Sequence, residues 1–294
     1  MIVGDTQIVR DVFDLTEPDR NVLFNMSVGE ARERVASGDP DRVREIDGHF
    51  ALVARDGHIV RMARSLQVPL RYFIVKRTDG PALVAGHRID VIQRWLKERG
   101  FVDQFHPTYT RMVPAHYVTK IELVGCPDPN PTYDRFFTPN REVLPADTDE
   151  IGRRYIGALS DTIHKWLNRI PETSPVGVCF SGGIDSGAVF LVLYHAMRSA
   201  GMNLGRLKAF TLSVAGGGDD LAQARRFLEA TDLQLFHEPV EVPTDYVDLI
   251  ETIRVTEDYK PLDVQAGAMA LALCRGVRER YPDWQHLIDG DGGG

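Results

Sequence analysis

The stretch VGVCFSGGIDS, residues 176–186, decides the fold of this chain. Its first five residues predict a short buried strand, and the apolar run Ala188–Met197 after it predicts a helix. The two adjacent glycines between them let the backbone approach a ligand closely and offer consecutive amide groups to an anion. The positive end of the following helix adds to this attraction. The segment therefore predicts a phosphate site at the carboxyl end of a parallel strand.

Strands and helices alternate throughout the second half of the chain. This alternation is typical of a doubly wound parallel sheet, in which each crossover between strands carries a helix. We expect strands at 176–180, 207–214, 233–240 and 285–288, and helices at 149–167, 188–197, 221–231, 246–256 and 263–280. His195 lies among apolar residues of its helix, so it is expected in the core.

The first half has a different pattern, in which short strands are separated by turn residues. The pair Asp56-Gly57 predicts a hairpin between strands at 50–54 and 59–63. Further strands are expected at 71–75, 82–85 and 117–124, with a helix at 90–99. Residues 138–150, which contain two prolines, are interpreted as the linker between domains. The first half is thus predicted to be a mostly antiparallel α+β domain.

Length and composition exclude several classes of protein. A chain of 294 residues suggests two domains, and its net charge of −8 argues against a general nucleic-acid or anionic-membrane surface. The longest apolar runs are about half the ~20 residues that a membrane-spanning helix needs. Cys126, Cys179 and Cys274 are widely spaced and predict no disulfide framework. The start has no secretory-signal pattern, so we expect a soluble, cytoplasmic protein with neither nucleic-acid nor membrane partners.

Other glycine-rich motifs fit the loop less well. A Walker A loop needs a lysine, and a dinucleotide fingerprint needs glycines that are not adjacent. A hydrolase nucleophile elbow would use Ser181, but Cys179 stands where its leading glycine should be. A glycine turn without a ligand is a further alternative. Asp219-Asp220 is likewise either a helix N-cap pair or a metal–phosphate site.

The loop at 181–186 resembles the SGGxDS loop of the N-type ATP pyrophosphatases, which activate a carboxyl or carbonyl oxygen by adenylation and release pyrophosphate. The segments around it narrow the resemblance to the asparagine synthetase family, which includes the β-lactam synthetases. Residues 210–214 and 218–222 resemble the family's second strand and its acidic, metal-contacting turn. Residues 237–238, 256–258 and 288–293 are similar to the next strand, an acidic segment and the pyrophosphate loop.

The first half also resembles this family. Residues 46–52 are similar to its LxGxFAFAL strand, and residues 63–73 to its ARDxxGxxPLYY hairpin. The resemblance implies a degenerate, half-size glutaminase-like domain of the Ntn-hydrolase type at 1–140. It implies an ATP-binding domain at 141–294, of the adenine nucleotide alpha hydrolase-like type and C-terminally incomplete.

Two features depart from the family pattern. The family's glutaminase uses a cysteine after the initiator Met, whereas residue 2 is Ile, so glutamine hydrolysis is not expected. Gly294 stands where the family carries a metal-binding Asp. We expect either a second polypeptide that completes the synthetase domain or a longer parent chain.

The resemblance also implies roles for individual residues. The pyrophosphate part of ATP is expected at Ser181, Gly182, Gly183, Asp185, Ser186, Gly290 and Asp291. Backbone near Leu212 is expected to contact adenine, and Asp220 to hold Mg²⁺. Asp185, placed to cap the helix or order the loop, and Glu257 are the expected catalytic residues.

The function implied is ATP-dependent amide formation, in which a small-molecule carboxylate reacts through an acyl-adenylate with an amine or ammonia. AMP and pyrophosphate are the other products. The alternatives are a catalytically inactive nucleotide-binding pseudo-enzyme, a subunit of a split synthetase, and a serine hydrolase that uses Ser181.

Overall fold

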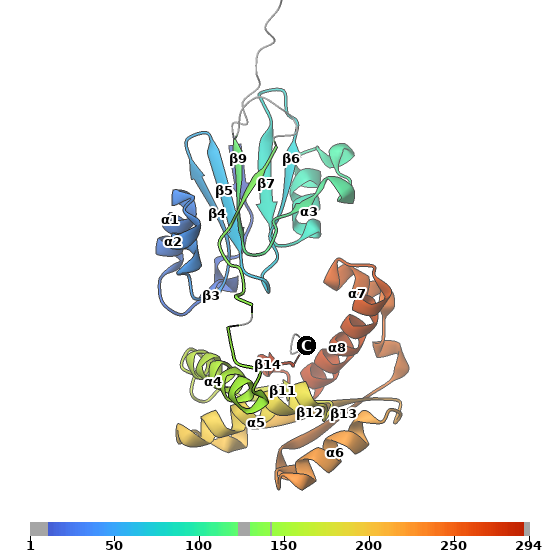
Figure 1. Cartoon of the computed structure of the whole chain (residues 1–294). Helices are drawn as coiled ribbons and strands as arrows, with labels where there is room; N and C mark the ends of the chain where they lie inside the picture. The colour runs from blue at the N-terminus through green and yellow to red at the C-terminus, as the bar shows by residue number, and fades with distance from the viewer. Residues whose placement is uncertain (1–10, 123–129, 142, 291–294) are drawn as a thin grey trace, which may run out of the picture. The chain divides into compact units, whose positions relative to one another are not determined.

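The computed structural model describes residues 11–122, 130–141 and 143–290. The chain divides into two compact units, Met1–Arg141 (unit 1) and Glu142–Gly294 (unit 2), which Figure 1 shows in blue to green and in green to red. Each unit has its own buried core.

Unit 1 is built on two four-stranded sheets. The first has the order β1-β7-β6-β8, from β1 (Asp11–Asp14), β7 (Ala82–Gly86), β6 (Arg71–Val75) and β8 (Arg111–Met112). The second has the order β10-β9-β5-β4, from β10 (Thr132–Arg135), β9 (Tyr117–Glu122), β5 (Ile59–Arg64) and β4 (Ala51–Asp56). Val53 and Met62 of one sheet and Leu83 of the other belong to the same buried cluster. The expected hairpins are present, and only the β1–β7 pair among these strands is parallel in the described part of the unit.

Helices cover the outer faces of both sheets of unit 1 (Figure 1). α1 (Val28–Ser37) and α2 (Pro40–Arg44) pack on the β4–β5 sheet, and α3 (Ile89–Glu98) packs on the β6–β7 sheet. β2 (Val22–Leu23) pairs with β3 (Gly48–His49), and short 3₁₀ helices lie at Pro18–Arg20, Val102–Gln104 and Pro107–Tyr109. Residues 11–46 therefore contain strands and helices to which the sequence analysis assigned no structure.

Unit 2 contains a parallel sheet with the order β13-β12-β11-β14, as the alternating pattern predicted. Its strands are β11 (Val176–Cys179), β12 (Leu207–Val214), β13 (His237–Val242) and β14 (His286–Ile288), and each neighbouring pair is parallel. All four carboxyl ends therefore lie at one edge of the sheet.

The two faces of this sheet carry different helices. Val176, Val178 and Ala209 face α4 (Thr148–Leu167), α5 (Ile184–Ser199) and α6 (Asp220–Ala230). Phe210, Val240 and Val242 face α8 (Pro261–Arg280), on which α7 (Leu249–Thr256) packs in turn. Figure 1 shows α8 on one side of the sheet and α4, α5 and α6 on the other. Helices on both faces make unit 2 a doubly wound α/β domain.

Several expectations for unit 2 were wrong in detail. The strand expected at 233–240 begins only at His237, because Gln234–Phe236 forms a 3₁₀ helix that leaves Leu235 92% exposed. The helix expected from 246 begins at Leu249, after a 3₁₀ turn at Thr244–Tyr246. His195 is exposed rather than in the core. The last residues of the expected linker already belong to α4.

No helix in the described ranges combines the length and the apolar character that crossing a bilayer requires.

The contact between α8 and β13 depends on a glycine. A Cβ at Gly276 would lie 2.5 Å from Val240 Cγ1 and 2.6 Å from Val242 Cγ1, and both valines are buried. The helix can therefore approach the sheet this closely only without a side chain at position 276.

We expect Gly276→Ala to destabilise unit 2 by about 1–3 kcal/mol, because overpacking outweighs the gain in helix propensity. Gly152→Ala in α4 is the matched control. A Cβ there meets no atom within 4 Å, so the change should stabilise by about 0.5–1 kcal/mol. Urea unfolding of the full chain, followed by tryptophan fluorescence, measures both effects. Equal changes in the two variants would contradict the close approach of α8.

Candidate functional site

The loop between β11 and α5 is held by a network of its two serines. The amide of Ser181 donates to Ser186 Oγ (3.3 Å), and the two hydroxyl groups are 3.2 Å apart. Ser186 Oγ donates to the Gly183 carbonyl, and the Gly183 amide donates to Ser181 Oγ, both at 3.3 Å. Ser186 is 7% exposed, so its hydroxyl lies largely out of contact with solvent, whereas Ser181 is exposed. The serines therefore fix the loop, and the Ser181 hydroxyl is engaged within it rather than by a histidine partner.

Two glycines bring other parts of the backbone against this loop. Gly182 has φ +76°, and a Cβ there would lie 2.6 Å from the amide nitrogen of Ala224 in α6. A Cβ at Gly290, just after β14, would lie 2.7 Å from the amide nitrogen of Ser186. The loop, the first turns of α5 and α6 and the end of β14 therefore meet at one point, which a larger side chain would force apart.

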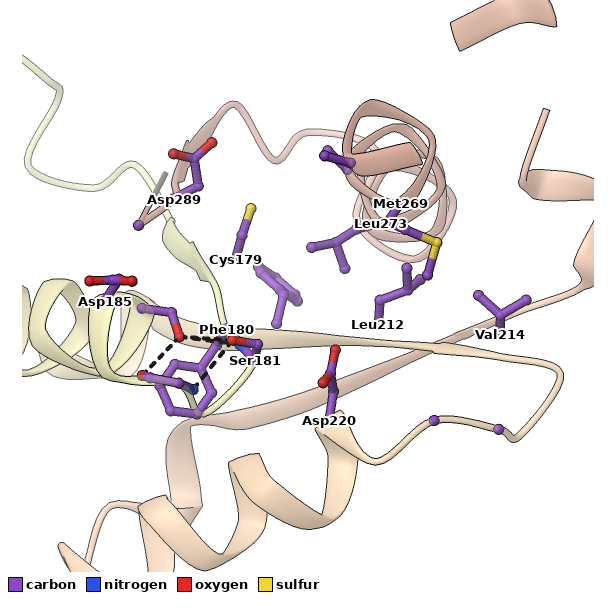
Figure 2. A pocket seen from close by; sticks show the side chains of 18 residues that line it. Cys179, Phe180, Ser181, Asp185, Leu212, Val214, Asp220, Met269, Leu273 and Asp289 are labelled. Carbon is purple, nitrogen blue, oxygen red and sulfur yellow. Dashed lines mark hydrogen bonds between the residues drawn. The ribbon is translucent and has the colours of Figure 1, made fainter. Parts of the chain in front are cut away.

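A pocket of about 650 Å³ opens beside this meeting point (Figure 2). One part of its wall is polar and contains Ser181, Gly183 and Ser186 of the loop. The other part is apolar and is formed by residues of β12 and α8. The members of the apolar wall are Phe210, Leu212, Val214, Ala266, Met269, Ala270 and Leu273.

The electrostatics of the polar part favour phosphate together with a cation. Residues from the first turns of α5 and α6 line the pocket, and a helix N-terminus presents amide groups and a partial positive charge to an anion. Asp185, Asp220 and Asp289 add carboxylates to the same wall. Burial raises the pKa of the Cys274 thiol on α8, and the charge of Asp289 raises it further.

The structure brings most of the predicted site residues together. Those that line the pocket are Ser181, Gly183, Asp185, Ser186, Leu212, Asp220 and Gly290. Gly182, which lies between Ser181 and Gly183 in the sequence, is buried. Glu257 lies elsewhere, at the C-cap of α7 with φ 54°, and does not line the pocket. Asp291 is outside the described residues. The role of Glu257 stays a prediction.

The expected helix-capping role of Asp185 is wrong. Gly183 occupies the N-cap of α5 and no side chain caps it, while Asp185 lies exposed in the first turn. Asp219 does occupy the N-cap position of α6, but its side chain makes no capping hydrogen bond. Asp220, one residue later, lines the pocket, so the two aspartates are not a simple capping pair.

The sequence analysis missed the apolar wall, and it placed Asp289 in the segment that resembles the pyrophosphate loop without naming it as a site residue. In the sequence analysis, the apolar run Ala266–Cys274 was used to exclude a membrane span. The spacing of its apolar residues also indicates the apolar wall. Ala266, Met269, Ala270 and Leu273 lie at i, i+3, i+4 and i+7, which places them on one side of a helix. The sequence alone does not indicate which side of this helix faces the pocket, because that depends on how α8 packs on the sheet.

Residues 159–293 match the family model for asparagine synthase. The matched segment, called the asparagine synthase domain below, covers just under half of the chain. No curated protein matches the chain.

Among solved structures, the chain is similar to glutamine-dependent NAD⁺ synthetase from Acinetobacter baumannii, determined in complex with ADP. The identity is 14% and the TM-score 0.31, over 59% of this chain and 31% of that one. The chain thus spans about a third of that protein's length.

The asparagine synthase domain contains the loop, the sheet edge and the whole pocket described above.

We expect Ser186→Ala to loosen the loop of the asparagine synthase domain, because it removes the partner of the Ser181 amide and of the Gly183 carbonyl. The cost should be about 1–3 kcal/mol in unfolding free energy. Hydrogen exchange at the Ser181 amide should become at least about fivefold faster. Ser199→Ala, an exposed change in the last turn of the same helix, is the control and should alter neither quantity. Unchanged exchange in Ser186→Ala would show that the serine network does not order the loop.

Proposed function

We propose that this protein activates a carboxylate with ATP, releases pyrophosphate and transfers the acyl group to an amine or ammonia. One observation carries the proposal. The glycine loop, the first turns of α5 and α6, and Asp289-Gly290 all line one pocket that also has an apolar wall. A nucleotide needs this combination, because its phosphates are anionic and its base is largely apolar.

The phosphates would bind to the polar part of the pocket. Gly182 and Gly183 bring backbone amides close to the ligand, and the hydroxyls of Ser181 and Ser186 fix the position of that backbone. Since the serine network is formed within the protein, little loop ordering is left for the ligand to cause. Adenine would lie beside Leu212, between β12 and α8.

Mg²⁺ fits the donor set of this wall. No group of three or more His, Cys, Asp or Glu side chains is gathered for a metal in the described part of the chain. Mg²⁺ in nucleotide sites usually takes only one or two carboxylates and completes its coordination with phosphate oxygens and water. Asp220 would hold it, and bound Mg²⁺ would neutralise the charge of the leaving pyrophosphate.

The reaction would proceed in two displacements. A carboxylate oxygen attacks the α-phosphorus of ATP and the bond to the bridging oxygen breaks, so pyrophosphate leaves and an acyl-adenylate forms. The neutral amine nitrogen then attacks the acyl carbon, the bond to the AMP oxygen breaks, and the nitrogen loses a proton to solvent. Asp185 is the carboxylate that we assign to holding the incoming ammonium ion by charge until it gives a proton to solvent and becomes the nucleophile, since the serines rather than Asp185 order the loop.

Unit 1 would be the degenerate glutaminase-like domain that the resemblance implies. The motif resembling the LxGxFAFAL strand lies in β3 and β4, and the hairpin motif lies across β5 and β6. The second motif thus joins the two four-stranded sheets, because residues 65–70 connect β5 of one sheet to β6 of the other.

The full chain incubated with ATP, Mg²⁺, hydroxylamine as the amine and a panel of carboxylates should form AMP and pyrophosphate in equal amounts. Product formation should depend on the carboxylate, because the α-phosphorus is attacked only by that group. ADP and phosphate as products would refute the assignment. Tight ATP binding without any turnover would instead favour the alternative of an inactive nucleotide-binding protein.

The pair Asp220→Asn and Asp219→Asn tests the metal assignment. Asp220→Asn should weaken ATP binding by at least about tenfold when Mg²⁺ is present. In EDTA the same variant should bind ATP more tightly than the parent chain, because a carboxylate that repels the phosphates is gone. Asp219→Asn should behave like the parent chain in both conditions, since Asp219 does not line the pocket. Calorimetry measures both affinities, and equal effects of the two variants would contradict a metal role for Asp220.

A further inference from the structure

An apolar stripe on α8 continues the sheet-facing side of the helix beyond the part that covers the sheet. Leu273 packs in one buried cluster with Phe210 of the sheet. Leu262, Ala266 and Met269 lie on one line with Leu273, at the spacing i, i+4, i+7 and i+11. Leu262 and Met269 are exposed, although the exposed part of such a helix is usually polar. This outer part of the stripe is therefore not needed to cover the sheet.

This apolar stripe leads from the surface of unit 2 into the nucleotide pocket. Leu262 at its outer end is 76% exposed, Met269 is 42% exposed, and Leu273 at its inner end is 6% exposed. Ala266, Met269 and Leu273 line the pocket, and Figure 2 shows Met269 and Leu273 on the side of α8 that faces Leu212. At 1.5 Å per residue the stripe is about 16 Å long.

The base of a nucleotide would occupy only the inner part of this stripe. Adenine beside Leu212 would contact Met269 and Leu273, whereas Leu262 lies two helical turns, or about 10 Å, further out. The outer part is therefore free for the second substrate.

The charges of the opposite wall restrict that substrate. Asp185, Asp220 and Asp289 place three carboxylates along the polar side of the pocket. They favour a metal ion and a cationic amine, and they repel any anionic group that the metal does not neutralise. A carboxylate that is activated beside the metal meets this condition, but a second carboxylate on the same molecule does not.

We propose that the carboxylate substrate is a monocarboxylic acid with an apolar chain, and that this chain lies along Leu262 and Ala266, beyond the part of the stripe that adenine covers. This inference rests on the proposed function, because it names the substrate class of the same site. Aspartate, a dicarboxylate with no apolar chain, would be a poor substrate.

Calorimetry with the full chain, Mg²⁺ and a non-hydrolysable ATP analogue tests the proposal, with butyrate, hexanoate, octanoate and aspartate as probes. Affinity should rise by about fourfold for each methylene that the stripe buries, and aspartate should bind more weakly than butyrate. No dependence on chain length, or tightest binding by aspartate, would overturn the proposal. Failure of the ATP analogue itself to bind would instead contradict the proposed function.

Two variants show where the chain binds. Leu262→Gln should remove most of the gain from hexanoate to octanoate and leave affinity for the ATP analogue unchanged, since Leu262 does not line the pocket. Leu235→Gln, at a residue 92% exposed on the 3₁₀ helix before β13, is the matched control and should change nothing. A second apolar groove, lined by Ile156, Leu191 and Phe227, is the competing location for a hydrocarbon chain. Octanoate binding that is lost in Ile156→Gln but retained in Leu262→Gln would contradict the assignment to α8.

Discussion

The backbone of Gly182 lies directly against α6 at Gln223 and Ala224, and the rest of the candidate site depends on this contact. A Cβ at Gly182 would come within 2.8 Å of three backbone atoms of α6, and its φ of +76° is one that other residues adopt only at a cost. Gly290 makes a similar contact with the first turn of α5. With both glycines in place, two helix N-termini and two strand ends converge, and their amides and carboxylates face one pocket. No single motif would create that arrangement by itself.

The pocket is polar on one wall and apolar on the other because of how a parallel sheet is built. Its strands end at the same edge, so the loops after β11, β12 and β14 provide the polar wall. Alternate residues of β12 point to opposite faces, which directs Leu212 and Val214 towards α8 while Ala209 faces the core on the other side. α8 then closes the apolar wall, and Gly276 allows it to lie close to β13. In our proposal, the loops at the strand ends carry out the chemistry, and α8 selects the substrate.

Local sequence was sufficient to predict the loop and the parallel sheet, because both depend on patterns within a few residues. Ser181, Gly183 and Ser186 were placed correctly on a strand–loop–helix unit, and Asp220 was placed at the pocket. The capping role of Asp185 was wrong because Gly183 takes that position. The α8 wall was missed because its contribution arises only when residues distant in sequence pack together. The strands and helices of residues 11–46 are short, and β1 pairs with a strand some 70 residues later, so local periodicity carried little information about them.

The most direct test of this account is a crystal structure of the full chain with Mg²⁺ and a non-hydrolysable ATP analogue. The account predicts phosphate groups against the backbone of Ser181–Ser186, a metal ion at Asp220, and the base between Leu212 and Met269. Phosphate groups bound away from this loop, or a base in the second apolar groove, which Ile156, Leu191 and Phe227 line, would contradict it.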